Sequence, residues 1–333
     1  MHEGILSAIG STPLVRLKRV FKEIDFQLYA KLENLNPAGS IKDRPAIYII
    51  KQGIESGAIL PDTVIVESSS GNMGLGLAQA CSYYGLRLIC VVDAKTTSQN
   101  LHLLKAYGAE IDVITEPDPV TGEFLQARLN RAQHLVQTIE NSFWPNQYAN
   151  LNNPAAHRQT MREIAEALDG KVDYLFGAAS TCGTIRGCAE YARENDLATR
   201  VIGVDAIGSV IFGGKSARRL IPGHGAAVRP ALYQPGIVDS SVQVSDLDAV
   251  VGCRRLAKYE AILAGGSSGA VIAAIDQMRD RIEPGATCVA ILADRGERYL
   301  DTVYSDDWVE HHFGNVACLW QASAEEQVLE MAR

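Results

Sequence analysis

The sequence predicts an α/β protein in which two doubly wound lobes enclose a site. Three observations lead to this prediction. Short apolar runs alternate with helix-like segments, as parallel β-α-β units require. Three glycine-rich turns each follow a predicted strand and begin a predicted helix. The 333 residues, of which 47% are hydrophobic and 21% charged, are enough for two sub-domains or one large α/β unit.

Two short strands and a helix are expected first. The strands cover 12–17 and 27–32, and Pro37, Gly39 and Ser40 then interrupt the chain before a helix over 43–55. Ser40 is the expected N-cap of this helix. The alternation that follows predicts strand 64–67, helix 73–84, strand 87–92, helix 98–107, strand 110–114 and helix 124–138.

An irregular stretch over 140–154 is expected to separate this block from a second one. The second block predicts strand 174–177, helix 184–195, strand 201–205, a helix that begins at Ala270 and strand 287–292. The pattern breaks at about His311, and the tail 311–333 receives no assignment. We therefore expect a large lobe formed by 1–40 and 153–310, and a small lobe formed by 41–152.

The composition and the cysteine pattern limit the classes of function that the protein can have. With 31 basic and 39 acidic residues, the formal net charge of −8 argues against nucleic-acid binding. The first residues do not resemble a targeting signal, and no uncharged apolar run could span a membrane, so a cytoplasmic protein is expected. Seven scattered cysteines without a C-x-x-C pair indicate reduced thiols, mostly in the core. No metal site is expected, since Glu310, His311 and His312 resemble one only superficially.

A lysine at the first turn of a helix is the first candidate for chemistry. Lys42 lies in the segment 36–44, Asn-Pro-Ala-Gly-Ser-Ile-Lys-Asp-Arg. Desolvation and the positive end of the helix would lower its pKa, as a Schiff-base lysine requires. From the residues alone, a solvated surface lysine is about equally plausible.

The glycine turns could bind anions. The run of serines in 67–74 could hold a carboxylate through hydroxyl and N–H groups, and 180–184 suits a phosphate monoester. Helix capping is the alternative explanation for both segments. Neither is a nucleotide motif, because 71–76 is not G-x-G-x-x-G and no Walker lysine follows any of the turns.

These segments resemble the fold type II pyridoxal 5′-phosphate (PLP) enzymes, the cysteine synthase and cystathionine β-synthase family. The family motif asparagine-proline-x-glycine-serine-x-lysine-aspartate-arginine corresponds to 36–44, and the resemblance covers roughly 4–305. It implies a tryptophan synthase β-like fold, PLP as the cofactor and Lys42 as the Schiff-base residue. It also implies amino-acid substrates and a homodimer.

The resemblance further implies roles for residues in each turn. Asn72 would hydrogen-bond the 3′-oxygen of PLP, and Ser267 would face its pyridine nitrogen. A neutral hydroxyl there favours β-elimination over transamination. The cofactor phosphate would be held by Ser180, Thr181, Cys182, Gly183 and Thr184. The substrate would be bound by Ser69, Ser70, Asn72, Met73, Gln147, Tyr148 and Gly225, the last of these in a glycine loop (223–225) that moves on closure.

Three further stretches, 146–150, 208–213 and 294–301, are similar to the N-(2-amino-2-carboxyethyl)-L-glutamate synthases of staphyloferrin B siderophore biosynthesis. These enzymes join O-phospho-L-serine to L-glutamate and make a precursor of 2,3-diaminopropionate. Cysteine synthases usually carry Phe and Gly where Tyr148 and Ser180 are found.

A cysteine synthase that uses sulfide is the nearest alternative function, and a PLP-binding regulatory subunit without turnover is a more distant one. Candidate arginines for the anionic substrates are Arg44, Arg218, Arg219 and Arg229.

Overall fold

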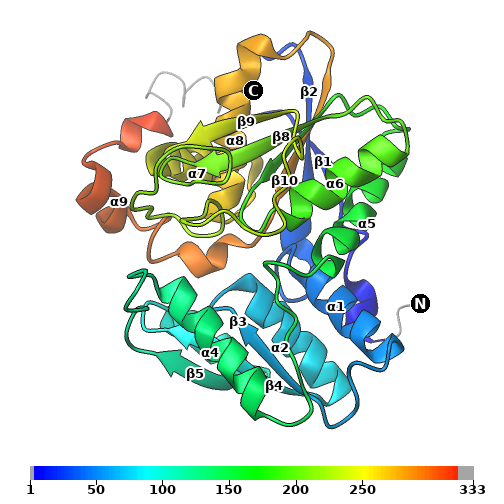
Figure 1. Cartoon of the computed structure of the whole chain (residues 1–333). Coiled ribbons are helices and arrows are strands. Elements are labelled where there is room, and N and C mark those ends of the chain that lie inside the picture. The colour runs from blue at the N-terminus through cyan, green and yellow to red at the C-terminus, as the bar shows by residue number, and fades with distance from the viewer. Residues whose placement is uncertain (1–3, 322–333) are drawn as a thin grey trace.

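The computed structural model describes residues 4–321, which form two α/β lobes (Figure 1). One lobe contains a six-stranded sheet of order β1-β2-β10-β7-β8-β9, and the other contains a four-stranded sheet of order β5-β4-β3-β6. Every strand pair in the two sheets is parallel except β1 with β2. The predicted α/β fold class is confirmed.

The strands of the described chain are β1 (Leu14–Leu17), β2 (Gln27–Leu32), β3 (Val64–Ser68), β4 (Arg87–Asp93), β5 (Glu110–Ile114), β6 (Ser142–Phe143), β7 (Tyr174–Ala178), β8 (Arg200–Ala206), β9 (Ser240–Val244) and β10 (Thr287–Leu292). The α-helices are α1 (Asp43–Glu55), α2 (Asn72–Tyr84), α3 (Ser98–Ala106), α4 (Phe124–Thr138), α5 (Asn152–Ala167), α6 (Gly183–Glu194), α7 (Asp246–Glu260), α8 (Gly266–Met278) and α9 (Asp306–Phe313). Two short 3-10 helices matter for the site, η2 (Glu33–Leu35) and η4 (Gly296–Tyr299).

Helices cover both faces of each sheet. Successive side chains of a strand point to opposite faces, so Ala290 of β10 packs into the core beneath α7 and α8, whereas Val289 and Ile291 pack into the core beneath α5 and α6. In the smaller sheet, Ile65 of β3 faces α1, α2 and α3, and Val66 faces α4. Burial on both faces explains why these strands are almost continuously apolar.

The sequence analysis was incomplete in the connecting regions. The stretch 140–154, expected to be irregular, contains β6 and the start of α5. Strand β9 and helices α7 and α9 were not predicted, and α9 includes the beginning of the unassigned tail. The rest of that tail, 322–333, lies outside the described residues. The boundaries expected for the two lobes stay a prediction.

The expected N-cap of α1 was also wrong. Lys42, not Ser40, occupies the N-cap position. Ser40 is buried and forms an isolated β-bridge with Asp294, and its hydroxyl accepts the backbone N–H of Lys42 at 3.2 Å. Ser40 therefore lies two residues before the N-cap, because its backbone is paired with the segment after β10.

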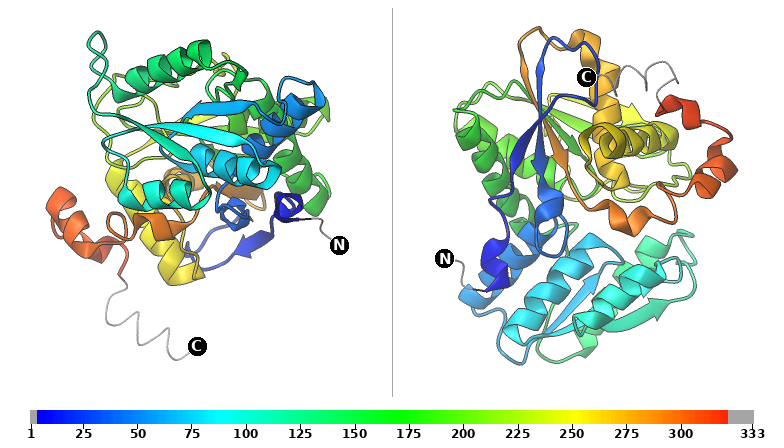
Figure 2. Two further views of the ribbon diagram at one scale, coloured as in Figure 1. Left: turned by 90° about the horizontal axis from the view of Figure 1, so that it is seen from below. Right: turned by 180° about the vertical axis from the view of Figure 1, so that it is seen from behind.

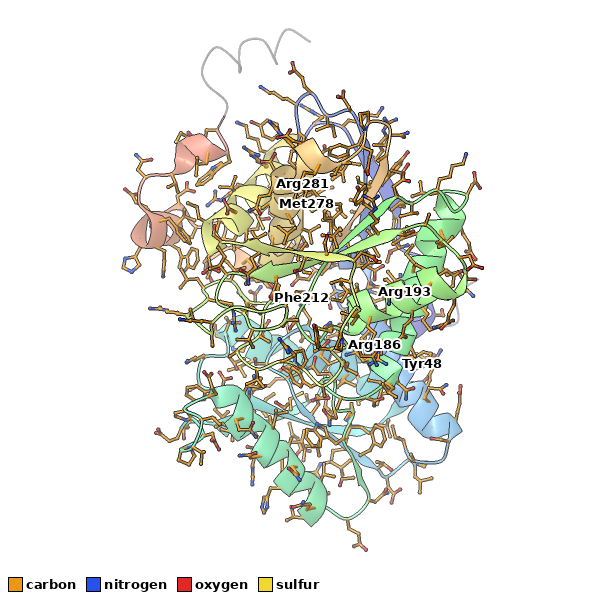
Figure 3. The ribbon with its side chains drawn as sticks, turned by 45° about the horizontal axis from the view of Figure 1, so that its top comes forward. Tyr48, Arg186, Arg193, Phe212, Met278 and Arg281 are labelled. Carbon is orange, nitrogen blue, oxygen red and sulfur yellow. The ribbon has the colours of Figure 1, made fainter. Side chains whose placement is uncertain are left out.

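A long loop over 207–239 joins β8 to β9 and carries the glycine loop 223–225. Arginines of α6 anchor its second half, since Arg186 donates to the Leu232 carbonyl at 3.3 Å and Arg193 to the Gly236 carbonyl at 2.7 Å. Phe212 stacks edge-on against Tyr233 (Figure 3 labels Phe212 and both arginines). The loop is thus tied to α6, whose first turn contributes to the site.

The cysteines follow the prediction. All seven are free thiols; six are buried and Cys318 is exposed. Within residues 4–321, no helix is both long enough and apolar enough to cross a bilayer.

Candidate active site

Segments that follow three parallel strands meet in one cavity between the lobes. Its lining includes Lys42 and Asn72, the turn 180–184 after β7, Gly223, and Ser267 at the start of α8. Ligands of open α/β sheets bind beyond the carboxyl ends of their strands, which is where these turns lie. Residues from the lysine motif, from the three glycine turns and from the loop 223–225 therefore come together here.

Lys42 lies at the N-terminus of α1 and is partly buried. Burial is the largest influence and lowers the pKa of its amine from 10.5 to about 8, while the charges of Cys182 and Asp294 raise this pKa in part. The predicted direction of the shift is confirmed, with desolvation as the main cause. An amine with this pKa is substantially neutral, and hence nucleophilic, slightly above physiological pH.

The turn 180–184 forms a cradle at the N-terminus of α6. The hydroxyl of Thr181 accepts N–H groups from Gly183 and from the side chain of Asn153, both at 3.3 Å. Thr184 lies 3.3 Å from the buried His157 ring, whose pKa is lowered well below its ordinary value by burial and by the charges of Lys42 and Arg44. Neutral donors and a helix N-terminus thus converge on this part of the cavity.

The packing and the backbone of this cradle are tightly constrained. A Cβ at Gly183 would lie 2.1 Å from the Asn153 side-chain oxygen, so only glycine fits there. That oxygen is buried and has no hydrogen-bond partner among the described residues. Cys182 adopts the left-handed conformation with φ 67°, which L-residues occupy at some energetic cost.

The turn after β3 is organised by its own hydroxyls and by α4. Ser69 accepts the Gly74 backbone N–H at 3.0 Å, and Ser70 accepts a hydrogen bond from Arg128 at 3.1 Å. Arg128 also pairs with Asp93 at 3.2 Å. This guanidinium is the cationic group beside the serine turn, and the sequence analysis missed it. No local motif could have identified it, because the contact joins residues 58 positions apart.

Gln147 and Tyr148 lie beside the same turn but do not line the cavity around Lys42. Gln147 donates to the Ser68 carbonyl at 3.4 Å. Tyr148 is partly buried, and burial raises the pKa of its hydroxyl, which Arg128 lowers and Glu67 raises. Burial also raises the pKa of Glu67 to about 7.

The structure also places Met73, His224 and Gly225. The Met73 side chain is buried in the core of the smaller lobe, so only its backbone could face a substrate. Gly225 adopts φ 73° and donates to the Ala179 carbonyl at 2.7 Å. His224, beside it, is 3% exposed, and neither ring nitrogen has a hydrogen-bond partner within the described chain.

Three of the four candidate arginines are engaged elsewhere. Arg44 forms buried ion pairs with Glu33 and Glu163, both at 2.7 Å. Arg219 donates to the Gly208 carbonyl at 2.7 Å, and Arg229 to the Ile211 carbonyl at 3.1 Å. Arg218 is exposed. None of these contacts places a candidate arginine at the serine turn, where Arg128 lies paired with Asp93.

The residues present fit PLP. An amine with a lowered pKa, that of Lys42, is available for the aldehyde, and the helix start at Gly183 with the hydroxyls of Thr181 and Thr184 suits the phosphate. Ser267 lines the same cavity and would offer a neutral hydroxyl to the ring nitrogen.

Fold and site together define a PLP-dependent enzyme of fold type II. The chain belongs to the pyridoxal-phosphate dependent enzyme family, whose model matches residues 5–294.

Solved structures of this type are similar to the chain. An O-acetylserine dependent cystathionine beta-synthase from Helicobacter pylori is 31% identical, with a TM-score of 0.85 over 92% of this chain and 99% of that chain. A cysteine synthase from Entamoeba histolytica is 32% identical, with a TM-score of 0.85 over 91% of each chain. An O-ureido-L-serine synthase is 30% identical, with a TM-score of 0.85 over 92% of this chain and 98% of that chain. The chain is accordingly a PLP-dependent β-replacement synthase.

Proposed function

We propose that the enzyme converts O-phospho-L-serine and L-glutamate to N-(2-amino-2-carboxyethyl)-L-glutamate and phosphate. The product would serve 2,3-diaminopropionate and siderophore biosynthesis. The observation that carries the proposal is the polar substrate side of the site. Ser180 carries a hydroxyl in the lining of the cavity, Tyr148 carries one beside the serine turn, and Arg128, which is paired with Asp93, donates to Ser70. Sulfide needs neither hydroxyls nor a positive charge, whereas a phosphorylated donor and a dicarboxylate acceptor need both.

Lys42 is the base of the proposed reaction. Bound PLP supplies the electron sink that makes the α-proton acidic and allows the β-substituent to leave. The neutral amine of Lys42 removes the α-proton of the donor, and the Cβ–O bond breaks as phosphate departs with the electron pair. The neutral amine of glutamate then forms a bond to Cβ and loses its proton. Finally, Lys42 returns a proton to Cα.

The serine turn is the proposed site of the donor carboxylate. Ser69 and Ser70 lie at the N-terminus of α2, whose first N–H groups have no partner within the helix. Arg128 approaches from α4 and neutralises negative charge there. Since the chain carries a net charge of −8, such local donors are required for an anionic substrate.

The test separates donor from acceptor. The PLP-loaded enzyme is mixed with O-phospho-L-serine, then with L-glutamate or sulfide, and released phosphate and product mass are followed. We expect glutamate to give the coupled amino acid with stoichiometric phosphate. Turnover with sulfide alone would make the enzyme a cysteine synthase, and a requirement for O-acetylserine would refute the phosphorylated donor.

A second experiment tests the role of Lys42. The variant Lys42→Ala should abolish both turnover and the borohydride-reducible covalent adduct with PLP. An adduct that persists would exclude Lys42 as its site.

A further inference from the structure

The amide of Asn72 is held at both ends by charged groups from one segment. Its nitrogen donates to a carboxylate oxygen of Asp294 at 2.8 Å, and its oxygen accepts from Arg298. Both partners belong to the segment that follows β10, more than 200 positions further along the chain. This segment, which includes η4, lies between the two lobes in the front view (Figure 1, orange) and in the view from behind (Figure 2, right).

These two partners permit only one orientation of the amide. Arg298 can only donate hydrogen bonds, so it must face the carbonyl end of Asn72. The Asp294 oxygen that faces Asn72 also accepts the Tyr299 hydroxyl at 2.6 Å, so it acts as an acceptor and must face the amide nitrogen. An amide nitrogen carries two N–H groups, and Asp294 uses one of them. The other remains available to a group in the cavity, which Asn72 lines.

Asp294 is itself held firmly. It is 1% exposed, its backbone carbonyl accepts the Gly265 N–H at 3.0 Å, and it pairs with Ser40 in a β-bridge. A Cβ at Gly265 would lie 2.0 Å from its second carboxylate oxygen, so the glycine is needed for this packing. The charged and titratable groups around it are Lys42, Arg298, Tyr299 and Cys253.

We infer that Asp294 is a positioning residue that directs the free N–H of Asn72 toward the 3′-oxygen of PLP. The inference rests on the proposed contact of Asn72 with the cofactor and is independent of which acceptor the enzyme uses. Arg298 completes the arrangement, because it also donates to the Ala38 carbonyl at 2.5 Å. The same segment therefore connects the turn that carries Asn72 to the motif that carries Lys42.

A double-mutant cycle tests whether Asp294 acts through Asn72. Asn72→Ala, Asp294→Ala and the double variant are compared by the dissociation constant of PLP and by the absorbance maximum of the cofactor linked to Lys42. We expect each single change to weaken PLP binding about tenfold, as the loss of one hydrogen bond to a charged group does, and to shift the absorbance maximum. The double variant should lose no more than either single variant.

Two further variants keep the test decisive. Asp294→Asn retains an oxygen that can accept both donors, so it should restore the wild-type absorbance maximum and most of the affinity, even if Asp294→Ala folds poorly. Glu297→Gln, an exposed change in the same segment, should behave as wild type. Additive losses, about 100-fold in the double variant, would overturn the inference. An unchanged spectrum in Asn72→Ala would instead refute the contact between Asn72 and the cofactor.

Discussion

Burial and neighbouring charges shift the pKa of the Lys42 amine in opposite directions. Burial lowers its pKa to about 8, and the charges of Cys182 and Asp294 limit the shift. The sequence predicted the direction, because a lysine at a helix N-terminus is disfavoured as a cation. It did not identify Asp294, which is distant in the chain and lies near Lys42 because Ser40 pairs with the segment after β10.

The first residue-scale prediction concerns pH. Only a neutral amine attacks the aldehyde of PLP, so reconstitution of the PLP-free protein should accelerate as the pH rises, with a midpoint near 8 rather than near the ordinary 10.5. Stopped-flow absorbance measures this rate. Replacement of the exposed Lys51 by Ala should leave the midpoint unchanged. A midpoint above 10 would show that Lys42 is solvated before the cofactor binds.

The second residue-scale prediction concerns the choice of acceptor. The double change Tyr148→Phe and Ser180→Gly removes two hydroxyls from the substrate side of the site. Sites built to hydrogen-bond a polar substrate lose most of their preference when the bonding groups are removed. The ratio of kcat/KM for glutamate to that for sulfide should therefore fall at least tenfold, by about 1.4 kcal/mol. Tyr233→Phe, in the loop 207–239, serves as a control, and an equal fall there would contradict a specific role for Tyr148 and Ser180.

At the scale of elements, the strongest patterns gave the most accurate predictions. The helix over 43–55 and the strand over 287–292 have the bounds expected from the sequence. Helix α5 was missed because its buried face carries Asn153, His157 and Thr160, which a hydrophobic pattern does not reveal. Strand β9 was missed because it lies at the sheet edge and most of its residues are exposed.

Four elements are joined by a buried ion cluster that the sequence did not predict. Lys31 of β2 pairs with Glu163 of α5, and Arg44 of α1 pairs with both Glu163 and Glu33 of η2, all at 2.7 Å. Burial alone would raise the pKa of Glu163, but hydrogen bonds from Arg44 and Lys31 and the charge of Arg44 lower it to about 2. The cluster links α1, which begins just after Lys42, to the larger sheet.

The element-scale prediction follows from this cluster. Glu163→Gln leaves Lys31 without its carboxylate partner and should cost about 3 kcal/mol of unfolding free energy at pH 7. Glu166→Gln, on the same helix, breaks an exposed pair of 3.7 Å and should cost less than about 0.5 kcal/mol. Urea unfolding measures both changes, and equal losses would contradict the importance of burial.

The pH dependence gives an independent check on the same variant. The folded pKa of Glu163 is lowered, so its stabilisation is fully present above the unfolded pKa of 4.5 and is lost as the pH falls toward 2. The stability difference between wild type and Glu163→Gln should therefore shrink between pH 4.5 and 2. A difference that stays constant over this interval would show that the charge of Glu163 is not the source of the effect.

At the scale of the whole molecule, two sheets with helices on both faces bring distant turns to one junction. The lysine motif, the serine turn, the phosphate cradle, the start of α8 and the segment after β10 span residues 36–299 yet meet between the lobes. Parallel strands make this possible because their carboxyl ends share one edge of the sheet. The homodimer and the cytoplasmic location implied by the sequence stay predictions.

The sequence by itself determined the α/β class and most of the helices and strands, and it placed a lysine at the start of α1 and a glycine turn at the start of α6. These features depend on neighbouring residues, through hydrophobic periodicity, helix ends and glycine turns. Only the tertiary structure decided that Arg44 is bound within an ion cluster, that Arg128 lies at the serine turn and that Asp294 and Arg298 orient Asn72. Such contacts join residues from 11 to more than 200 positions apart, and they form only when the chain has packed.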